Sequence, residues 1–399
     1  MQVNVDNRPL LPFVPYVLLQ YGLLACLVAM RLQSRGRVIA FLTYASILSS
    51  VFLYTTGDAQ MNYATGCTAM GHILIAFHLL CLSDPLNDFR HEHDKIPPRE
   101  MSYARRVYWA FCVIFNSRGV GSTCQIANVP PRSSEGKWTF VRQKLLTAFR
   151  WFLVVDLTQT YHRAHPLFSR QAEDIFSLAT QGHVQRCINI FVCLSSLVAH
   201  IGLLYALPAA IIVALGISEP RDWPDMYGRW SDAYTVRRFW GRTYHQLIRR
   251  FTASIGKAVC RLLGLRTGSR ASSNTQLYVG FAVSGIMHCG GDLMVSRALP
   301  GLSFPFFFAQ AVAISLEDAV IHAGKGIFAP KTKGARAALR WVGYAWVFAW
   351  LSVSAPLLLN WWIRAGVIDA SSVPFSLIGV VVPGFEKVLV RWLGGSASV

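Results

Sequence analysis

The sequence predicts an all-α polytopic membrane protein with about nine transmembrane helices, within a range of about eight to ten. Three observations support this fold class. The 399 residues are 53% hydrophobic and only 15% charged, and the mean hydropathy is +0.37, which is unlike a soluble protein of this length. Apolar runs of the length of a membrane span recur along the chain, and positive charge gathers in alternate loops between them.

A spanning helix needs roughly 20 mostly apolar residues, because its backbone groups must be satisfied internally in hydrocarbon. Segments of this kind cover residues 11–30, 38–55, 64–83, 144–160, 187–216, 277–295, 304–322, 338–362 and 373–393. Three of them are interrupted. The fourth carries Arg150 and Asp156, the fifth contains Pro208, and the ninth contains Pro383. The fifth segment is therefore either one kinked helix or two shorter pieces.

The net charge of +18 has a topological explanation. Loop 84–143 carries nine Lys or Arg and loop 217–276 carries eleven, whereas 56–63 has none. Because basic loops stay in the cytosol, we expect 84–143 and 217–276 to be large cytosolic loops and the C-terminus to be cytosolic. The chain is then one polytopic domain over 1–399 in a lipid bilayer, by default that of the endoplasmic reticulum. Nucleic acid is not an expected partner.

The segment around His288 holds the first candidate for chemistry. Ser284 and Asp292 lie one helical turn before and after it, so all three share a face of a continuous helix, and Asp292 could orient the imidazole. An unperturbed imidazole is mostly neutral at pH 7 and can accept a proton from a hydroxyl. Glycines at 285, 290 and 291 permit close approach of a neighbouring helix or an irregular turn beside a ligand. The alternative interpretation is a histidine that is hydrogen-bonded between helices.

A second candidate is the basic and aromatic run over residues 232–246. Arg238, Arg242 and His245 recur at helical spacing, with Trp240 and Tyr244 forming an i, i+4 pair. Such a face could lie on an anionic membrane surface. It could equally bind the phosphates of coenzyme A, since guanidinium groups grip phosphate oxygens through paired hydrogen bonds.

These two segments together carry a family resemblance. The run Arg237-Arg238-Phe239-Trp240-Gly241-Arg242-Thr243-Tyr244-His245-Gln246, followed by Phe281-Ala-Val-Ser284-Gly285-Ile-Met-His288, resembles the paired signature of wax-synthase-like acyltransferases, related to the membrane-bound O-acyltransferase superfamily. Further matches occur at 118–121, 128–130, 222–228, Gln310 and 317–318. The core of the resemblance covers residues 222–318. One departure is Tyr244, where the family usually has tryptophan.

The resemblance implies an acyl-CoA-dependent O-acyltransferase that needs no permanently bound cofactor and no metal. Its co-substrate would be acetyl-CoA or another acyl-CoA, and its acceptor a hydrophobic alcohol. The most similar variant of the family acetylates terpenoid and meroterpenoid natural products. In this interpretation His288 is the general base in an intramembrane chamber, and His245 polarises the thioester carbonyl. Arg238, Trp240, Arg242, Tyr244 and Gln246 would bind substrate and coenzyme A, and Ser284, Asp292, Glu317 and Asp318 would support the site.

Three alternatives remain open from the sequence. A long-chain wax-ester synthase would use the same residues on a fatty alcohol. A multipass transporter could use His288, Asp292, Glu317 and Asp318 as a proton or substrate path. A magnesium-dependent prenyltransferase would need two acidic clusters, and Asp222 with Asp225 is a poor second cluster beside the polar run 87–94. We expect no metal site.

Overall fold

The computed structural model describes residues 7–168, 177–324, 332–368 and 375–393, and these residues are predominantly helical. Two isolated β-bridges, between Leu10 and Thr55 and between His91 and Ser122, are present beside the helices. The chain divides into two compact units. The motif unit comprises the described residues of 4–129 and 227–347, and the α7–α8 unit comprises those of 130–226 and 348–399. The expectation of one domain over 1–399 stays a prediction.

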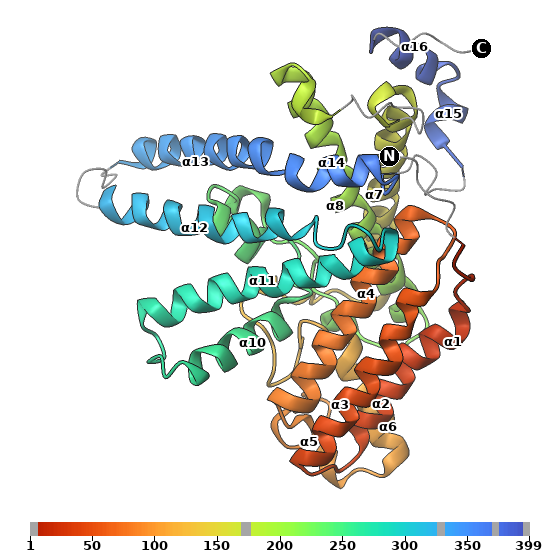
Figure 1. The fold of residues 1–399 in the computed structure, drawn as a ribbon, viewed down its shortest axis with the longest axis vertical. Helices are drawn as coiled ribbons and strands as arrows, with labels where there is room; N and C mark the ends of the chain where they lie inside the picture. The colour runs from red at the N-terminus through yellow and green to blue at the C-terminus, as the bar shows by residue number, and fades with distance from the viewer. Residues whose placement is uncertain (1–6, 169–176, 325–331, 369–374, 394–399) are drawn as a thin grey trace. The chain divides into compact units, whose positions relative to one another are not determined.

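The motif unit begins with a group of membrane-length and shorter helices (Figure 1). Its helices are α1 (Phe13–Val17), a π-helical turn (Leu18–Leu23), α2 (Leu24–Ala29), α3 (Ser34–Ser49) with a 3₁₀ extension (Ser50–Leu53), α4 (Ala59–Phe77) with a π-helical end (His78–Leu82), α5 (Pro85–Asp88) and α6 (Tyr103–Phe115). Leu24, Tyr44, Leu48 and Leu79 form the centre of their shared core.

The second half of the motif unit contains α9 (Val236–Arg238), a π-helical turn (Phe239–Thr243), α10 (Arg249–Leu262), α11 (Arg270–Val295), α12 (Phe304–Gly324) and the first part of α13 (Lys333–Ser354). Figure 1 shows α10, α11 and α12 side by side, and α11 also packs on α4. Helix α4 begins at Ala59 because the Asp58 carboxylate accepts the Met61 N–H at 2.8 Å.

The α7–α8 unit is built on two long helices that pack against each other, α7 (Lys137–Ala164) and α8 (His183–Ala214). Its other helices are the end of α13, α14 (Pro356–Arg364), α15 (Leu377–Val381) and α16 (Phe385–Trp392). Trp151 of α7 fills the space beside Gly202, where a Cβ would lie 2.6 Å from the indole nitrogen. Buried Asp156 accepts the Ile378 N–H at 2.8 Å, so it is a packing group of this unit.

Among the described residues, four helices are long and apolar enough to cross a membrane: residues 34–53, 59–82, 183–214 and 304–324. The bent pair of α13 and α14 would make a fifth. The first predicted segment corresponds to an apolar helix of shorter length, Phe13–Ala29. The chain is therefore an all-helical membrane protein, and the prediction of about nine spans is not confirmed.

Some predicted segments differ in continuity from the helices that form. Residues 187–214 of the fifth predicted segment lie in one helix, α8, with Pro208 inside it, which settles the choice between one helix and two. The expected span 338–362 is broken at Ala355, before the proline at the start of α14. Within the described part of 373–393, the single expected span is wrong: Pro383 and Gly384, the latter with φ of +86°, separate the short helices α15 and α16. The two expected cytosolic loops also contain helices, α6 and α10.

Candidate active site

The imidazole of His288 lies on α11 and faces α4 and α12. Its Nδ1 is 3.0 Å from the hydroxyl of Tyr63 and 3.5 Å from Sγ of Cys67, both on α4. The ring of Phe307 on α12 stacks on it, with centroids 4.0 Å apart and planes 12° apart. The His288 side chain is only partly buried. The imidazole is therefore held at its Nδ1 edge by α4 and on one face by Phe307, and part of the side chain is exposed.

Glycines bring α4 and α11 together at this point, which is the first of the two arrangements that the sequence allowed. A Cβ on Gly66 would lie 2.2 Å from the carbonyl oxygen of Gly290, so the two backbones are in direct contact. A Cβ on Gly291 would lie 2.8 Å from the Tyr63 ring. Gly285 faces α12, where the Phe304 ring would be 2.7 Å from an added Cβ. The close approach of α4 places the Tyr63 hydroxyl beside His288.

The hydrogen bonds of the Asp292 carboxylate reach the His288 ring through two other residues. Its carboxylate accepts the backbone N–H of Ser303 at 2.7 Å and the Ser303 hydroxyl at 2.6 Å. The Ser303 Oγ is in turn 3.0 Å from the Tyr63 hydroxyl, and this hydroxyl contacts His288. In this series of hydrogen bonds, Tyr63 is the residue next to the imidazole. Ser284 is buried on the same helix one turn before His288.

The basic and aromatic run does not form the continuous helix that its spacing suggested. Helix α9 ends at Arg238, a π-helical turn covers Phe239–Thr243, and Tyr244 is extended with ψ of 161°. Arg238, Arg242 and His245 therefore do not share one helical face. Gln246 explains why the helix does not continue. Its side-chain amide donates to the carbonyls of Trp240 and Tyr244, both at 2.8 Å, which in a helix would accept backbone N–H groups.

His245 lies at the end of this turn, before α10. Burial, and to a smaller extent the nearby charge of Arg118, lowers its pKa to about 4. His245 is therefore neutral at pH 7. Its Nδ1 is buried and makes no hydrogen bond to any described residue. An uncharged imidazole with an uncommitted ring nitrogen is suited to bind a polar group of a ligand.

Aromatic rings connect the two histidines. Tyr244 contacts His245 with centroids 4.3 Å apart and Trp240 with centroids 5.2 Å apart. Phe306 lies 6.3 Å from Trp240, and Phe307 lies 5.1 Å from Phe306 and stacks on His288. A continuous series of aromatic contacts thus joins two histidines that lie 43 residues apart in the sequence.

The other predicted site residues mostly shape the run that carries His245. Arg238 donates to the Asp232 carboxylate at 2.9 Å and lies over the Tyr234 ring. Arg242 is exposed. The Glu317 carboxylate accepts the backbone N–H groups of Val236 at 2.7 Å and Arg237 at 3.2 Å, and Asp318 pairs with the Arg237 guanidinium. Glu317 and Asp318 therefore anchor the start of the run to α12.

The remaining motif matches in this unit also converge on the same run. Asn128, in a left-handed conformation with φ of 64°, donates to the Gly241 carbonyl at 3.0 Å. Gly228 donates its N–H to the Thr243 carbonyl at 2.9 Å, and the Trp240 indole donates to Gln310 at 3.1 Å. Segments separated by more than 100 residues in the sequence are thus joined around residues 240–245.

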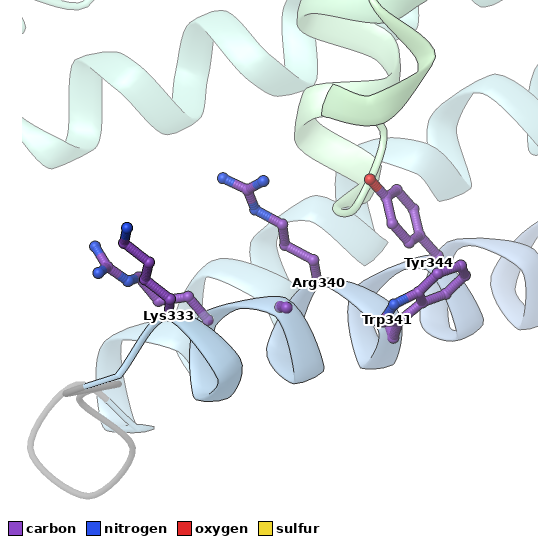
Figure 2. A pocket seen from close by; sticks show the side chains of 6 residues that line it. Lys333, Arg340, Trp341 and Tyr344 are labelled. Atoms are coloured by element: carbon purple, nitrogen blue, oxygen red, sulfur yellow. The ribbon is translucent and has the colours of Figure 1, made fainter.

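A basic groove lies on α13 close to this run. Its cavity of about 490 Å³ is lined by Lys333, Arg336, Ala337, Arg340, Trp341 and Tyr344. Figure 2 shows the side chains of Arg340 and Tyr344 on the same side of α13. The guanidinium of Arg340 lies 5.5 Å from the Tyr234 ring centre, and that of Arg238 lies 4.4 Å from the same centre. Arg340 of the groove and the predicted coenzyme A residue Arg238 therefore both lie over the Tyr234 ring.

Sequence reasoning missed Tyr63, Ser303 and Phe307. Tyr63 immediately precedes the predicted span 64–83, and Ser303 immediately precedes 304–322. Polar residues at span ends are ordinary, so nothing local marks these two. The only signal was indirect: the glycine pair 290–291 predicted that another helix comes close to His288.

The sequence of this chain is similar to a known family and to several named proteins. Residues 223–309 match the model of the membrane bound O-acyl transferase family. Acetyltransferase ple2 of Rhodocybe pseudopiperita is 32% identical over 88% of this chain and 90% of its own length. Acetyltransferase eriL of Hericium erinaceus is 31% identical over 90% and 94%, respectively. O-Mevalon transferase macI of Penicillium terrestre is 27% identical over 83% and 77%.

The chain belongs to the membrane-bound O-acyltransferase family. It is an O-acyltransferase, and the matched residues 223–309 include both His245 and His288. The resemblance stated from the sequence is confirmed, and the transporter and prenyltransferase alternatives no longer account for the chain. Acyl-CoA and an alcohol are the substrates that this family implies.

Proposed function

We propose that this protein is an O-acetyltransferase that moves the acetyl group of acetyl-CoA to a hydroxyl of a terpenoid or meroterpenoid alcohol in secondary-metabolite biosynthesis. The observation that carries the proposal is the series of aromatic contacts that joins His245 to His288 within the motif unit. One imidazole is partly exposed and hydrogen-bonded at Nδ1, and the other is neutral with a ring nitrogen uncommitted.

In this proposal His288 acts as the general base. Its imidazole takes the proton of the acceptor hydroxyl while the oxygen attacks the thioester carbonyl. A tetrahedral oxyanion forms, and His245 donates a hydrogen bond that stabilises its charge. The carbon–sulfur bond then breaks, and the proton on His288 passes to the departing thiolate. A thiolate is stable near its pKa of about 8.5, so one base suffices for the transfer.

Aromatic residues fit the binding of an apolar acceptor next to the reacting atoms. Phe306 and Phe307 line the path between Trp240 and His288, and a ring system of carbon and hydrogen gains free energy by replacing water there. Relatives named acetyltransferases support acetyl as the group transferred. A long-chain wax-ester synthase is the competing proposal with the same chemistry.

For coenzyme A, we assign the phosphates to the cations around Tyr234 and the α13 groove. Arg238, Arg336 and Arg340 supply guanidinium groups, which bind phosphate oxygens in pairs. Trp240, Arg242, Tyr244 and Gln246 then shape the passage from this groove to the histidines. Ser284, Asp292, Glu317 and Asp318 remain the supporting residues.

For the membrane arrangement, we propose that helices beyond the four apolar ones also lie in the bilayer, α11 among them, and enclose the site as a chamber. A polar helix is tolerated at membrane depth where it faces a cavity. The C-terminus would be cytosolic and the membrane that of the endoplasmic reticulum. Accessibility of single cysteines introduced at exposed positions such as Arg35 and Lys387 to a membrane-impermeant reagent tests the orientation.

The decisive test is an acyl-transfer assay. Microsomes that hold the wild type, His288→Ala or His322→Ala are incubated with labelled acetyl-CoA and a panel of terpenoid alcohols or a long-chain fatty alcohol. His322 is an exposed histidine near the end of α12 and serves as the matched control. We expect transfer to a terpenoid alcohol by the wild type and His322→Ala only. Equal transfer by His288→Ala would remove His288 from the mechanism, and transfer only to fatty alcohol would favour the wax-ester synthase.

A further inference from the structure

The hydrogen bonds behind His288 run through four residues from three elements. Asp292 of α11 contacts Ser303, which precedes α12; Ser303 contacts Tyr63 of α4; and Tyr63 contacts His288. The exposed fractions of Asp292 and Ser303 are 0% and that of Tyr63 is 6%, so water does not compete for these bonds. The direction of each bond can be worked out from the number of protons that each group carries.

The direction is set at the carboxylate. An ionised carboxylate only accepts hydrogen bonds, so both contacts from Ser303 must be donated by the backbone N–H and by the hydroxyl. The distance of 2.6 Å between Ser303 Oγ and the Asp292 oxygen is that of a hydroxyl donating to a charged oxygen. The single proton of Ser303 is therefore committed to Asp292.

The same count fixes the next two bonds. Because the Ser303 hydroxyl has no second proton, the Tyr63 hydroxyl must be the donor across the 3.0 Å between them. The Tyr63 oxygen then has no proton left for His288, and across the other 3.0 Å contact it can only accept from the Nδ1–H of the imidazole. Cys67 Sγ, 3.5 Å from Nδ1, is a second weak acceptor on that side.

We propose that Tyr63 and Ser303 are positioning residues that transmit the charge of Asp292 to His288 and hold its proton on Nδ1, which leaves Nε2 as the atom that accepts the substrate proton. This inference rests on the proposed function, in which His288 is the base. The three residues contact one another in series, and Tyr63 is the member that contacts the imidazole by a hydrogen bond at 3.0 Å.

A purely structural role is the competing explanation, because Asp292 and Ser303 also close the connection between α11 and α12. The variant Asp292→Asn distinguishes this structural role from the proposed control of the His288 tautomer. The asparagine amide can accept the Ser303 N–H and donate to the Ser303 hydroxyl, which keeps both contacts and their shape. Ser303 must then donate to Tyr63 and Tyr63 to Nδ1, so the proton moves to Nε2 and the base is lost.

The direct measurement is the ¹⁵N chemical shift of the His288 ring nitrogens in detergent-solubilised, histidine-labelled protein, assigned by its loss in His288→Gln. We expect a protonated Nδ1 and an unprotonated Nε2 in the wild type, the reverse in Asp292→Asn, and a mixture in Tyr63→Phe. A protonated Nε2 in the wild type would overturn the proposal, as would an unchanged tautomer in Asp292→Asn.

Kinetics supply the second measurement. We expect Asp292→Asn to lower kcat by about 100-fold or more with little change in KM for acetyl-CoA, because substrate binding is intact and the base is in the wrong tautomer. Tyr63→Phe and Ser303→Ala should each lower kcat by about tenfold, whereas Ser303→Thr, which keeps the hydroxyl, should retain more activity than Ser303→Ala. Full kcat in Asp292→Asn together with an inactive His288→Ala would refute the positioning of His288 by Asp292, Ser303 and Tyr63, and it would leave the proposed function in place. Full activity in His288→Ala would refute the proposed function itself.

Discussion

Gly291 and Tyr63 are in such close contact that a single methyl group on the glycine would lie 2.8 Å from the tyrosine ring. Real Cβ atoms do not approach a ring this closely, so the absence of a side chain at 291 is what allows Tyr63 to reach His288. The first prediction follows from this contact. Gly291→Ala should push Tyr63 away and cost about 1–3 kcal/mol of stability through overpacking.

The expected readout is a fall in kcat together with a lower melting temperature in detergent. Gly280→Ala is the matched control, because Gly280 lies on the same helix and has nothing within 4 Å of an added Cβ. Alanine is the better helix former, so this variant should be as stable as the wild type or more so, with unchanged kcat. Equal behaviour of the two variants would show that the 291 contact is not needed.

The second prediction concerns the hydrogen-bond donor at position 245. His245→Asn keeps an N–H that can reach a thioester oxygen, whereas His245→Leu keeps the bulk and removes the donor. We expect His245→Asn to retain at least about a tenth of the wild-type kcat and His245→Leu to lose about 100-fold or more, as when an oxyanion donor is removed. Similar rates for both variants in the microsomal acetyl-transfer assay would argue against carbonyl polarisation by His245.

Much of the architecture around the site was predictable because it depends on local sequence. Apolar length placed α3, α4, α8 and α12, and the glycines at 285, 290 and 291 predicted close helix packing, which the contacts with Phe304, Gly66 and Tyr63 confirm. The limits come from tertiary contacts. The spacing of Arg238, Arg242 and His245 indicated a helix, but the Gln246 amide satisfies two carbonyls of the run and turns the chain instead.

The partners of His288 illustrate the same limit at the level of single residues. Asp292 was expected to orient the ring from one turn away on α11, and this role stays a prediction. The hydrogen bonds of its carboxylate lead toward the ring through Ser303 and Tyr63, which lie 240 residues apart in the sequence. No periodicity within one helix specifies which residue of another helix lies opposite to it. The hydrogen bonds from Asp292 through Ser303 and Tyr63 to His288 could therefore not be predicted from the sequence.

The third prediction tests the phosphate assignment in the α13 groove. The double variant Arg336→Glu/Arg340→Glu should raise KM for acetyl-CoA about tenfold and leave kcat within about twofold, because the change affects binding away from the reacting atoms. Arg336→Lys/Arg340→Lys keeps the charge but not the paired geometry, and should give an intermediate KM.

A phosphate-free acetyl donor, the N-acetylcysteamine thioester, separates coenzyme A from anionic lipid as the ligand of this groove. If the groove binds coenzyme A, KM for this short donor is the same in the wild type and in the double glutamate variant. If the groove binds lipid phosphates, activity with both donors falls and depends on the content of anionic lipid in the vesicles. An unchanged KM for acetyl-CoA would contradict the assignment.

The fourth prediction uses the pKa of His245, which burial, followed by the charge of Arg118, lowers to about 4 from the ordinary value of about 6.5. Between these two pH values the unfolded chain holds a proton on this imidazole and the folded chain does not. Stability from the neutral imidazole is therefore fully present above about pH 6.5 and is lost as the pH falls toward 4.

His245→Asn cannot titrate, so the melting temperature of the wild type should fall more steeply than that of the variant between pH 6.5 and 4.5. The measurement is thermal unfolding in detergent at matched ionic strength, with the other histidines present in both proteins. Ionic strength is held constant because Arg118 contributes to the shift, and its influence would change with screening. If the melting temperatures of the wild type and His245→Asn differ by the same amount across this range, His245 titrates like an exposed histidine. The proposal that neutral His245 donates to the thioester oxygen would then be contradicted.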